Sequence, residues 1–137
     1  MLSVRRVAVC STFAALAVAP PAAVGRATTI ETVKVKMSEY RIRLDHARNR
    51  GYFAFDLRNT GKVRHEFIMI KTARTAKQLT VVNGKVSRHG WKVSLPLEPG
   101  EHRRLIVVPR LRPGHYVMIC GIPGHYQKGM RRDFTLR

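Results

Sequence analysis

Short stretches in which apolar and polar residues alternate recur along the chain. The clearest is Thr32–Met37, in which every second residue is apolar. Alternation with a period of two places every second side chain on one face, as in a half-buried β-strand. The runs that we expect to form strands are 32–37, 40–44, 52–57, 67–70, 104–108, 116–119 and 132–136.

Turn residues separate these runs, and no segment has a sustained helical period. Asn59–Gly61, Pro99–Gly100 and Pro113–Gly114 contain residues that favour tight turns. Residues 73–92 are rich in Lys, Arg and Thr, and we expect a long loop there with a helical turn near Ala76–Val81. Seven or eight short strands at this spacing predict an all-β fold, an antiparallel β-sandwich, with a small barrel as the alternative.

The first residues have the pattern of an export signal. The pair Arg5-Arg6 precedes the apolar run Val7–Ala19, and Gly25-Arg26-Ala27 offers small residues at the positions that a signal peptidase reads. We therefore expect residues 1–27 to be a signal peptide and residues 28–137 to form one domain. The expected location is periplasmic or otherwise extracytoplasmic, with membrane contact only if the segment stays as an uncleaved anchor.

The charge balance of the chain is strongly basic. Lys and Arg number 26 against 8 Asp and Glu, which gives a formal net charge of +18. The first 27 residues hold three arginines and no acid, so removing them lowers +18 by three to +15. Such a charge favours an acidic partner, which can be a protein, an anionic membrane surface or nucleic acid.

Without the signal, the chain keeps only one of its two cysteines, Cys120. Exported proteins meet a compartment that favours disulfides, but a single cysteine cannot form one within the chain. A lone thiol in that compartment is open to oxidation or cross-linking. A bound metal would protect it.

The residues after Cys120 form a motif with metal-binding chemistry. A thiolate, an imidazole and a thioether follow one another as Cys120, His125 and Met130, with Cys-x4-His-x4-Met spacing and turn residues in between. One loop can then direct three ligands at one point. A fourth ligand must come from elsewhere, and His65 is the best candidate. It begins a strand after the Asn59–Gly61 turn, and in a sandwich that strand can lie beside the one that ends at Cys120.

This set of donors favours copper over other metals. Two imidazoles and one thiolate with a weaker thioether form a blue-copper electron-transfer site. Zinc more often recruits a second Cys or a third His, and an iron–sulfur cluster needs more cysteines than this chain has. The alternative is that Cys120 is a small buried side chain and Met130 a core residue, with no metal at either.

The segments that carry these residues resemble the cupredoxins. The similarity covers most of residues 30–137, and it points to the sulfocyanin, auracyanin and rusticyanin-like members, which use the same loop spacing. The matching positions are Asn59-Thr60-Gly61, His65-Glu66-Phe67, Pro113-Gly114-His115-Tyr116, Cys120, Pro123-Gly124-His125 and Gly129-Met130.

The resemblance implies a Greek-key β-sandwich with one type 1 copper ion near one end. His65, Cys120 and His125 would be the strong equatorial ligands, Met130 would be the weak axial ligand, and the exposed edge of His125 would be the electron exit. Many cupredoxins carry Asn or another small polar residue directly after the first ligand His, where this chain has Glu66. That difference bears on the hydrogen bonds around the metal and on the reduction potential.

The other histidines, and the apolar residues that alternate along the strands, are expected to have structural roles. The histidines that we expect on the surface or within strands, away from the metal, are His46, His89, His102 and His115. The residues that we expect in the core are Phe67, Met69, Met118 and Phe134.

The basic residues fall into two groups. The first is a solvated face in or near the long loop and contains Lys71, Arg74, Lys77, Lys85, Arg88 and Lys92. The second flanks the predicted metal-binding loop and contains Lys128, Arg131 and Arg132. We expect the second group to steer the protein toward an acidic redox partner. An exported chain without a recognition motif is not expected to bind nucleic acid.

These observations predict a monomeric electron carrier that acts between a donor and an acceptor redox protein. No enzyme activity is expected, because the four ligands fill the copper site and the sequence has no Ser-His-Asp or paired-carboxylate arrangement. The rival interpretation is a copper carrier or assembly factor that delivers copper to an oxidase. Such a protein needs an exchangeable site, which is usually richer in Met and His.

Overall fold

The computed structural model describes residues 30–45, 53–87, 89–107 and 111–137. These residues form ten strands and no helix. The predicted signal peptide lies outside the described part of the chain, and so does His46. Within the described residues, no helix is long and apolar enough to cross a membrane.

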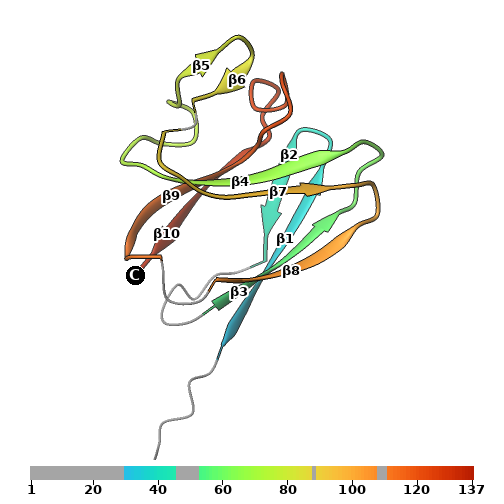
Figure 1. Cartoon of the computed structure of the whole chain (residues 1–137), viewed down its shortest axis with the longest axis vertical. Helices are drawn as coiled ribbons and strands as arrows, with labels where there is room; N and C mark the ends of the chain where they lie inside the picture. The colour runs from blue at the N-terminus through green and yellow to red at the C-terminus, as the bar shows by residue number, and fades with distance from the viewer. Residues whose placement is uncertain (1–29, 46–52, 88, 108–110) are drawn as a thin grey trace, which may run out of the picture.

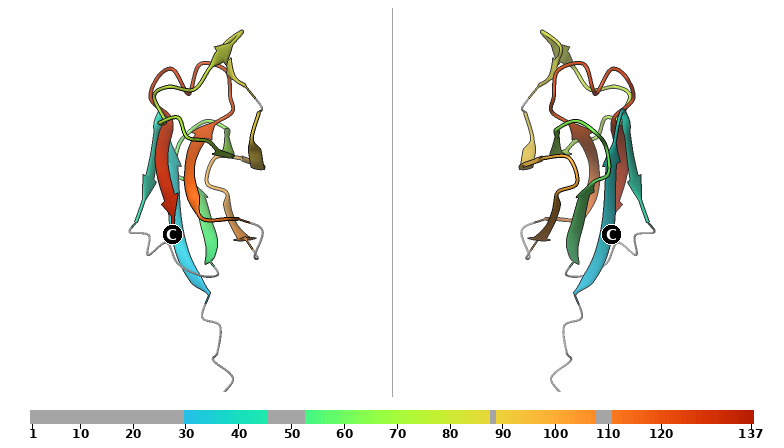
Figure 2. Two further views of the ribbon diagram at one scale, coloured as in Figure 1. Left: turned by 90° about the vertical axis from the view of Figure 1, so that its left-hand side faces the viewer. Right: turned by 90° about the vertical axis from the view of Figure 1, so that its right-hand side faces the viewer.

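Two four-stranded sheets pack face to face (Figures 1 and 2). The first sheet has the order β2 (Arg41–Leu44), β1 (Glu31–Ser38), β3 (Phe53–Asn59) and β8 (His102–Val107). The second has the order β10 (Arg131–Leu136), β9 (Gly114–Cys120), β4 (His65–Lys71) and β7 (Trp91–Leu97). Neighbouring strands are antiparallel except β1 and β3, which are parallel. The all-β, Greek-key sandwich prediction is confirmed, and the parallel pair is its one departure from antiparallel order.

The main core lies between the two sheets. Along β1, buried apolar side chains alternate with exposed Lys and Thr, as the sequence pattern predicted. Each large apolar side chain that is fully buried stabilises the fold by roughly 1.5–3 kcal/mol. The predicted core residues Phe67, Met69, Met118 and Phe134 are all buried in this cluster.

The two central strands of the second sheet, β4 and β9, are buried on both faces. A second apolar cluster covers the outer face of these strands, beneath the segment that links β4 to β7. The predicted metal-binding residues at the ends of β4 and β9 therefore rest on the most deeply buried strands. The buried members of the second cluster are Ile68, Ile70, Ala76, Val86, Val117, Ile119 and Tyr126.

The segment 73–92 differs from its prediction. The expected helical turn is a β-turn, closed by a 2.9 Å hydrogen bond from the Gln78 N–H to the Thr75 carbonyl. Beyond it, β5 (Val81–Val82) and β6 (Lys85–Val86) form a two-stranded ribbon. The turn residues Asn83 and Gly84 have φ of 49° and 75°, and positive φ at both positions is what a type I′ hairpin requires. The predicted loop also contains the start of β7.

One end of the sandwich gathers the predicted metal-binding residues. β4 begins at His65 and β9 ends at Cys120 at this end, and the loop 121–130 leads from there into β10. The β5–β6 ribbon stands beside that loop (Figure 1). A 3.2 Å hydrogen bond from the Gly124 N–H to the Gly84 carbonyl joins the two.

Candidate metal centre

The antiparallel pairing of β4 and β9 brings His65 and Cys120 together. Phe67 lies opposite Cys120 in the register, so the first residues of β4 adjoin the last residues of β9. The Glu66 N–H points at the Cys120 Sγ at 3.4 Å, and the Gly121 N–H donates to the Glu66 carbonyl at 3.0 Å. The prediction that the strand beginning at His65 lies beside the strand ending at Cys120 is confirmed.

Backbone hydrogen bonds fold the loop 121–130 back on itself. The Met130 N–H donates to the His125 carbonyl and the Cys120 N–H donates to the Met130 carbonyl, both at 3.0 Å. Gly124 and Gly129 have φ of 83° and 111°, which L-residues with side chains rarely adopt. The glycines therefore allow the tight turns that the sequence predicted, and the three motif residues end up bonded to one another through their backbones.

Three potential metal-binding atoms face one another at this point. The Nδ1 atoms of His65 and His125 are 3.3 Å apart, and the Cys120 Sγ lies 3.8 Å and 3.4 Å from them. The point equidistant from these three atoms lies about 2.0 Å from each, close to an ordinary metal–nitrogen bond length. Met130 is fully buried and is joined to the cluster by its backbone. His65, Cys120 and His125 are the one group of this kind among the described residues.

The chemistry of the cluster fits a metal ion better than an ordinary core. His65 is 0% exposed, and its Nε2 has no hydrogen-bond partner among the described residues. The polar contacts of its ring are those of Nδ1 with His125 and Cys120. Two imidazole Nδ1 atoms and a thiol buried against one another are poor partners for hydrogen bonds, and a metal at the common centre would bond Nδ1 of His65 and leave its Nε2 unchanged.

The pKa shifts of the three side chains also fit a site that binds a metal ion. Burial lowers the pKa of His65, with a further contribution from the charge of His125. Burial also lowers the pKa of His125, helped by the Lys128 ammonium. Neutral imidazoles are the form that binds metals. Burial raises the pKa of the Cys120 thiol, so a thiolate here needs a cation to stabilise it.

The turn before His65 is fixed by side chains from two other strands' ends. Asn59 is fully buried, and its amide donates to the carbonyls of Val63 at 2.8 Å and Leu97 at 3.1 Å. The Glu39 carboxylate accepts the N–H groups of Lys62 and Val63. The backbone N–H of Glu39 itself, followed by those of Lys62 and Val63, lowers the pKa of this carboxyl. The turn that leads into His65 is therefore held in place by hydrogen bonds with both Asn59 and Glu39.

The outer side of His125 is partly covered by an aromatic residue that the sequence did not single out. Tyr40 was predicted to start a strand, but it lies in the β1–β2 turn with φ of 59°. Its ring meets the His125 ring edge-on, with 5.3 Å between centroids. The Lys128 ammonium donates to the Tyr40 hydroxyl at 2.9 Å and lies 4.5 Å from the centroid of its ring. No local sequence pattern predicts the contact between Tyr40 and His125.

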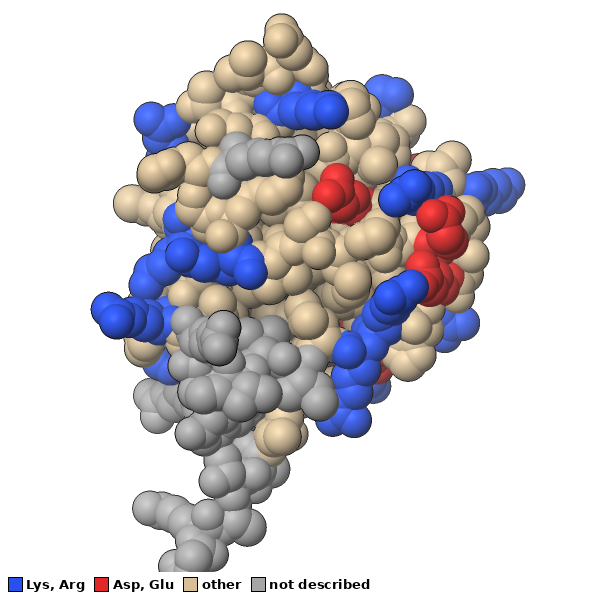
Figure 3. Space-filling view, in the orientation of Figure 1, with Lys and Arg blue, Asp and Glu red and all other residues tan. Residues whose placement is uncertain are grey.

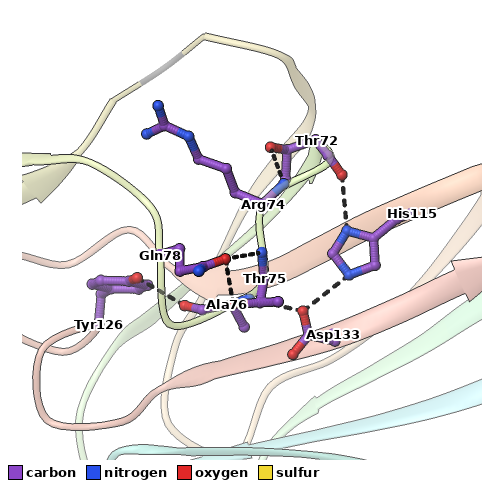
Figure 4. Close-up of polar contacts among 8 residues, drawn as sticks. All are labelled: Thr72, Arg74, Thr75, Ala76, Gln78, His115, Tyr126 and Asp133. Carbon is purple, nitrogen blue, oxygen red and sulfur yellow. Dashed lines mark hydrogen bonds and ion pairs between the residues drawn. The ribbon is translucent and has the colours of Figure 1, made fainter.

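A second network of hydrogen bonds, shown in Figure 4, connects the segment after β4 with β9, with β10 and with Tyr126 of the loop 121–130. His115 bonds through Nδ1 to the Thr72 carbonyl at 2.8 Å and through Nε2 to Asp133 at 3.0 Å. The same Asp133 oxygen accepts the Ala76 N–H at 2.7 Å, and the Tyr126 hydroxyl donates to the Ala76 carbonyl at 2.7 Å. His115 is therefore a structural residue outside the metal cluster, as expected. His89 and His102 are also outside it.

Comparison with known proteins supports the fold. No family model and no curated protein matches this sequence. The structure is similar to a dithionite-reduced auracyanin from the photosynthetic bacterium Roseiflexus castenholzii, with a TM-score of 0.52 and 19% identity over 82% of this chain and 99% of that chain. It is equally similar to auracyanin B, with a TM-score of 0.52 and 20% identity over 78% and 88% of the two chains. The chain therefore has the cupredoxin fold that its motifs predicted.

Proposed function

We propose that the chain is an exported type 1 copper protein that carries single electrons between larger redox proteins. One copper ion would be held by His65, Cys120 and His125, with Met130 as a weaker axial ligand. The observation that carries the proposal is the convergence of two Nδ1 atoms and one Sγ within 3.8 Å of one another. The cupredoxin fold around this cluster supports the same conclusion.

The protein's part in this function would be to hold the donors still. A bound copper ion would supply a one-electron couple between its cupric and cuprous states. Backbone bonds from Glu66 and Gly121 join the Cys120 and His65 segments, and the closed loop fixes His125. Donors held in one geometry change little between the two states, so little reorganisation accompanies each transfer.

Electrons would enter and leave beside His125, which is half-buried, whereas His65 and Cys120 are 0% and 1% exposed. The partner would be a redox protein with an acidic surface, because Lys128 in the loop and Arg132 just after it are exposed. Arg131 is committed elsewhere, since it donates to the Tyr126 carbonyl at 2.8 Å and packs on the Tyr126 ring. Figure 3 shows Lys and Arg side chains around the margins of one face, with fewer acidic ones among them.

The test is an optical and electron-spin-resonance spectrum of the copper-loaded protein, with Cys120→Ser as the matched variant. A thiolate–copper bond predicts an intense absorption near about 600 nm, which the serine variant loses. A colourless protein that binds copper equally well with and without the thiol would contradict the proposal. Rapid loss of copper to a mild chelator would favour copper delivery instead.

A further inference from the structure

The acidic side chains of this basic protein divide into two classes. Five of those that the structure describes lie within ion-pair distance of a Lys, Arg or His: Asp45, Asp56, Glu98, Glu101 and Asp133. Apart from Glu31, whose side chain is outside the described part of the structure, the other two are Glu39 and Glu66, for which no ion pair occurs among the described residues. These two flank the candidate metal centre, Glu39 beneath the turn that precedes His65 and Glu66 between His65 and the Cys120 loop.

The Glu66 side chain is held in place next to the loop that carries the thiol. Its Oε1 accepts a 2.7 Å hydrogen bond from the Ser94 hydroxyl on β7. Its other oxygen lies against Gly121, where an added Cβ would collide with the carboxylate and with the Ile68 side chain. The absence of a side chain at Gly121 therefore leaves the space that the carboxylate occupies, directly after Cys120 in the chain.

The neighbouring cations do not neutralise this carboxylate by direct contact. Glu66 lines a hollow of about 300 Å³ together with Arg64 and Lys85. Arg64 pairs with Glu98 at 3.3 Å instead. The bonded partner of the Glu66 side chain is the neutral hydroxyl of Ser94, so no bonded cation cancels its negative charge, which solvent and the charges of Arg64 and Lys85 reduce only in part.

We propose that the Glu66 carboxylate sets the reduction potential of the centre, stabilising the oxidised, divalent state relative to the reduced, monovalent one. This inference rests on the proposed copper site. A negative charge attracts a divalent ion about twice as strongly as a monovalent ion at the same place. The Glu66 N–H, which donates to the Cys120 Sγ, acts in the opposite sense by stabilising electron density on sulfur. Substitution of the side chain leaves that N–H in place, so the two effects are separable.

The primary test is Glu66→Gln, which keeps the shape and removes the charge. The ratio of cupric to cuprous affinity, measured by competition with chelators specific for each state, should fall roughly tenfold. For a one-electron couple this corresponds to a rise of about 59 mV in reduction potential. Glu66→Asp keeps the charge and should stay closer to the parent protein. Asp56→Asn is the matched control, because it makes the same change in net charge beside His102, on the other sheet.

Two further measurements separate this inference from the proposed function. An intact visible band with an unchanged affinity ratio in Glu66→Gln would overturn the role of Glu66 and leave the copper proposal standing. Zinc binding to the metal-free protein needs no redox chemistry, and Glu66→Gln should weaken zinc affinity while Asp56→Asn does not. Equal zinc affinity in both variants would also overturn the role of Glu66.

Gly121→Ala, which displaces the carboxylate without removing it, should shift the affinity ratio in the same direction as Glu66→Gln.

Discussion

The two histidines of the candidate centre sit in different kinds of structure. His65 is fully buried at the start of a central strand, behind a turn pinned by Asn59 and Glu39. His125 is half-buried in a loop and is held by contacts that come from outside the sandwich core: the Tyr40 ring, and the ribbon through Gly124. The inner half of the site, around His65 and Cys120, is therefore set by sheet pairing. The outer half, around His125, depends on side chains and loops that meet only after folding.

Replacing each of the two histidines by alanine tests the difference in their burial most directly. His65→Ala leaves a cavity in a dry region and should lower the free energy of unfolding by roughly 2–5 kcal/mol. His125→Ala is nearer the surface and should cost roughly 1 kcal/mol or less. Urea unfolding of the metal-free proteins measures both.

The same pair of variants tests access from solution. Added imidazole should enter the space left in His125→Ala and restore the copper spectrum, but it should not do so in His65→Ala. Rescue of both variants to the same degree would show that the two histidines are equally accessible and would remove the distinction.

A smaller effect is expected at the brace beneath the loop. Tyr126→Phe removes the hydroxyl that donates to the Ala76 carbonyl and accepts the Leu79 N–H, at 2.7 Å and 3.2 Å. Leaving these buried groups unpaired should cost roughly 1–3 kcal/mol in unfolding free energy. Tyr40→Phe is the control, because its hydroxyl bonds to Lys128 near the surface and should contribute less. Equal losses would contradict the assignment of Tyr126 as an internal brace.

The pH dependence of the metal-free protein should reflect the same burial. Both histidines have a folded pKa below the ordinary 6.5, so the unfolded chain binds protons at a higher pH than the folded protein. Stability should therefore be complete above about pH 6.5 and fall as the pH drops below it. Urea unfolding at about pH 7.5 and about pH 5 tests this. His65→Gln should flatten the dependence, and an unchanged slope in that variant would assign it to other groups.

The smallest effect concerns the outer surface alone. Neutralising Lys128 and Arg132 should slow the reaction with the anionic oxidant hexacyanoferrate(III) several-fold and flatten its salt dependence, because attraction between opposite charges accelerates encounter. Lys34→Gln and Lys36→Gln change the same number of charges on the exposed face of β1 and serve as the control. The expected effect on unfolding is within about 0.5 kcal/mol. An equal slowing in both pairs would indicate that net charge matters and location does not.

The strands and the fold of the loop that carries His125 could be predicted from the sequence because their signals are local. Period-two alternation identified seven strands, and the turn before His65 placed that residue at a strand start. Cys-x4-His-x4-Met spacing with glycines then predicted a closed loop, and Gly124 and Gly129 have the positive φ that such a loop needs. Local pattern and tertiary pairing agree here, which is why the prediction succeeded.

The segment 73–92 was predicted wrongly although its signals were present. Val-Val-Asn-Gly-Lys-Val has the Asn-Gly turn of a two-residue hairpin, but the surrounding basic residues gave the stretch the composition of a loop. The alternating run of β7 contains Pro96, which is tolerated because β7 is an edge strand. The contacts of Tyr40 with His125 and of His115 with Asp133 join residues far apart in the chain, so no short pattern could reveal them.

The hydrogen bond between the hairpin turn at Gly84 and the loop at Gly124 places the β5–β6 ribbon beside the surface around His125, where it forms a rim. Changing the length of the β5–β6 ribbon would reshape the surface beside His125, whereas the pairing of β4 with β9, which brings His65 and Cys120 together, would remain. Exposed Val81 and Val82 give the rim an apolar outer edge. A change in the ribbon should therefore alter recognition at this end of the molecule with a smaller effect on His65 and Cys120 than on His125.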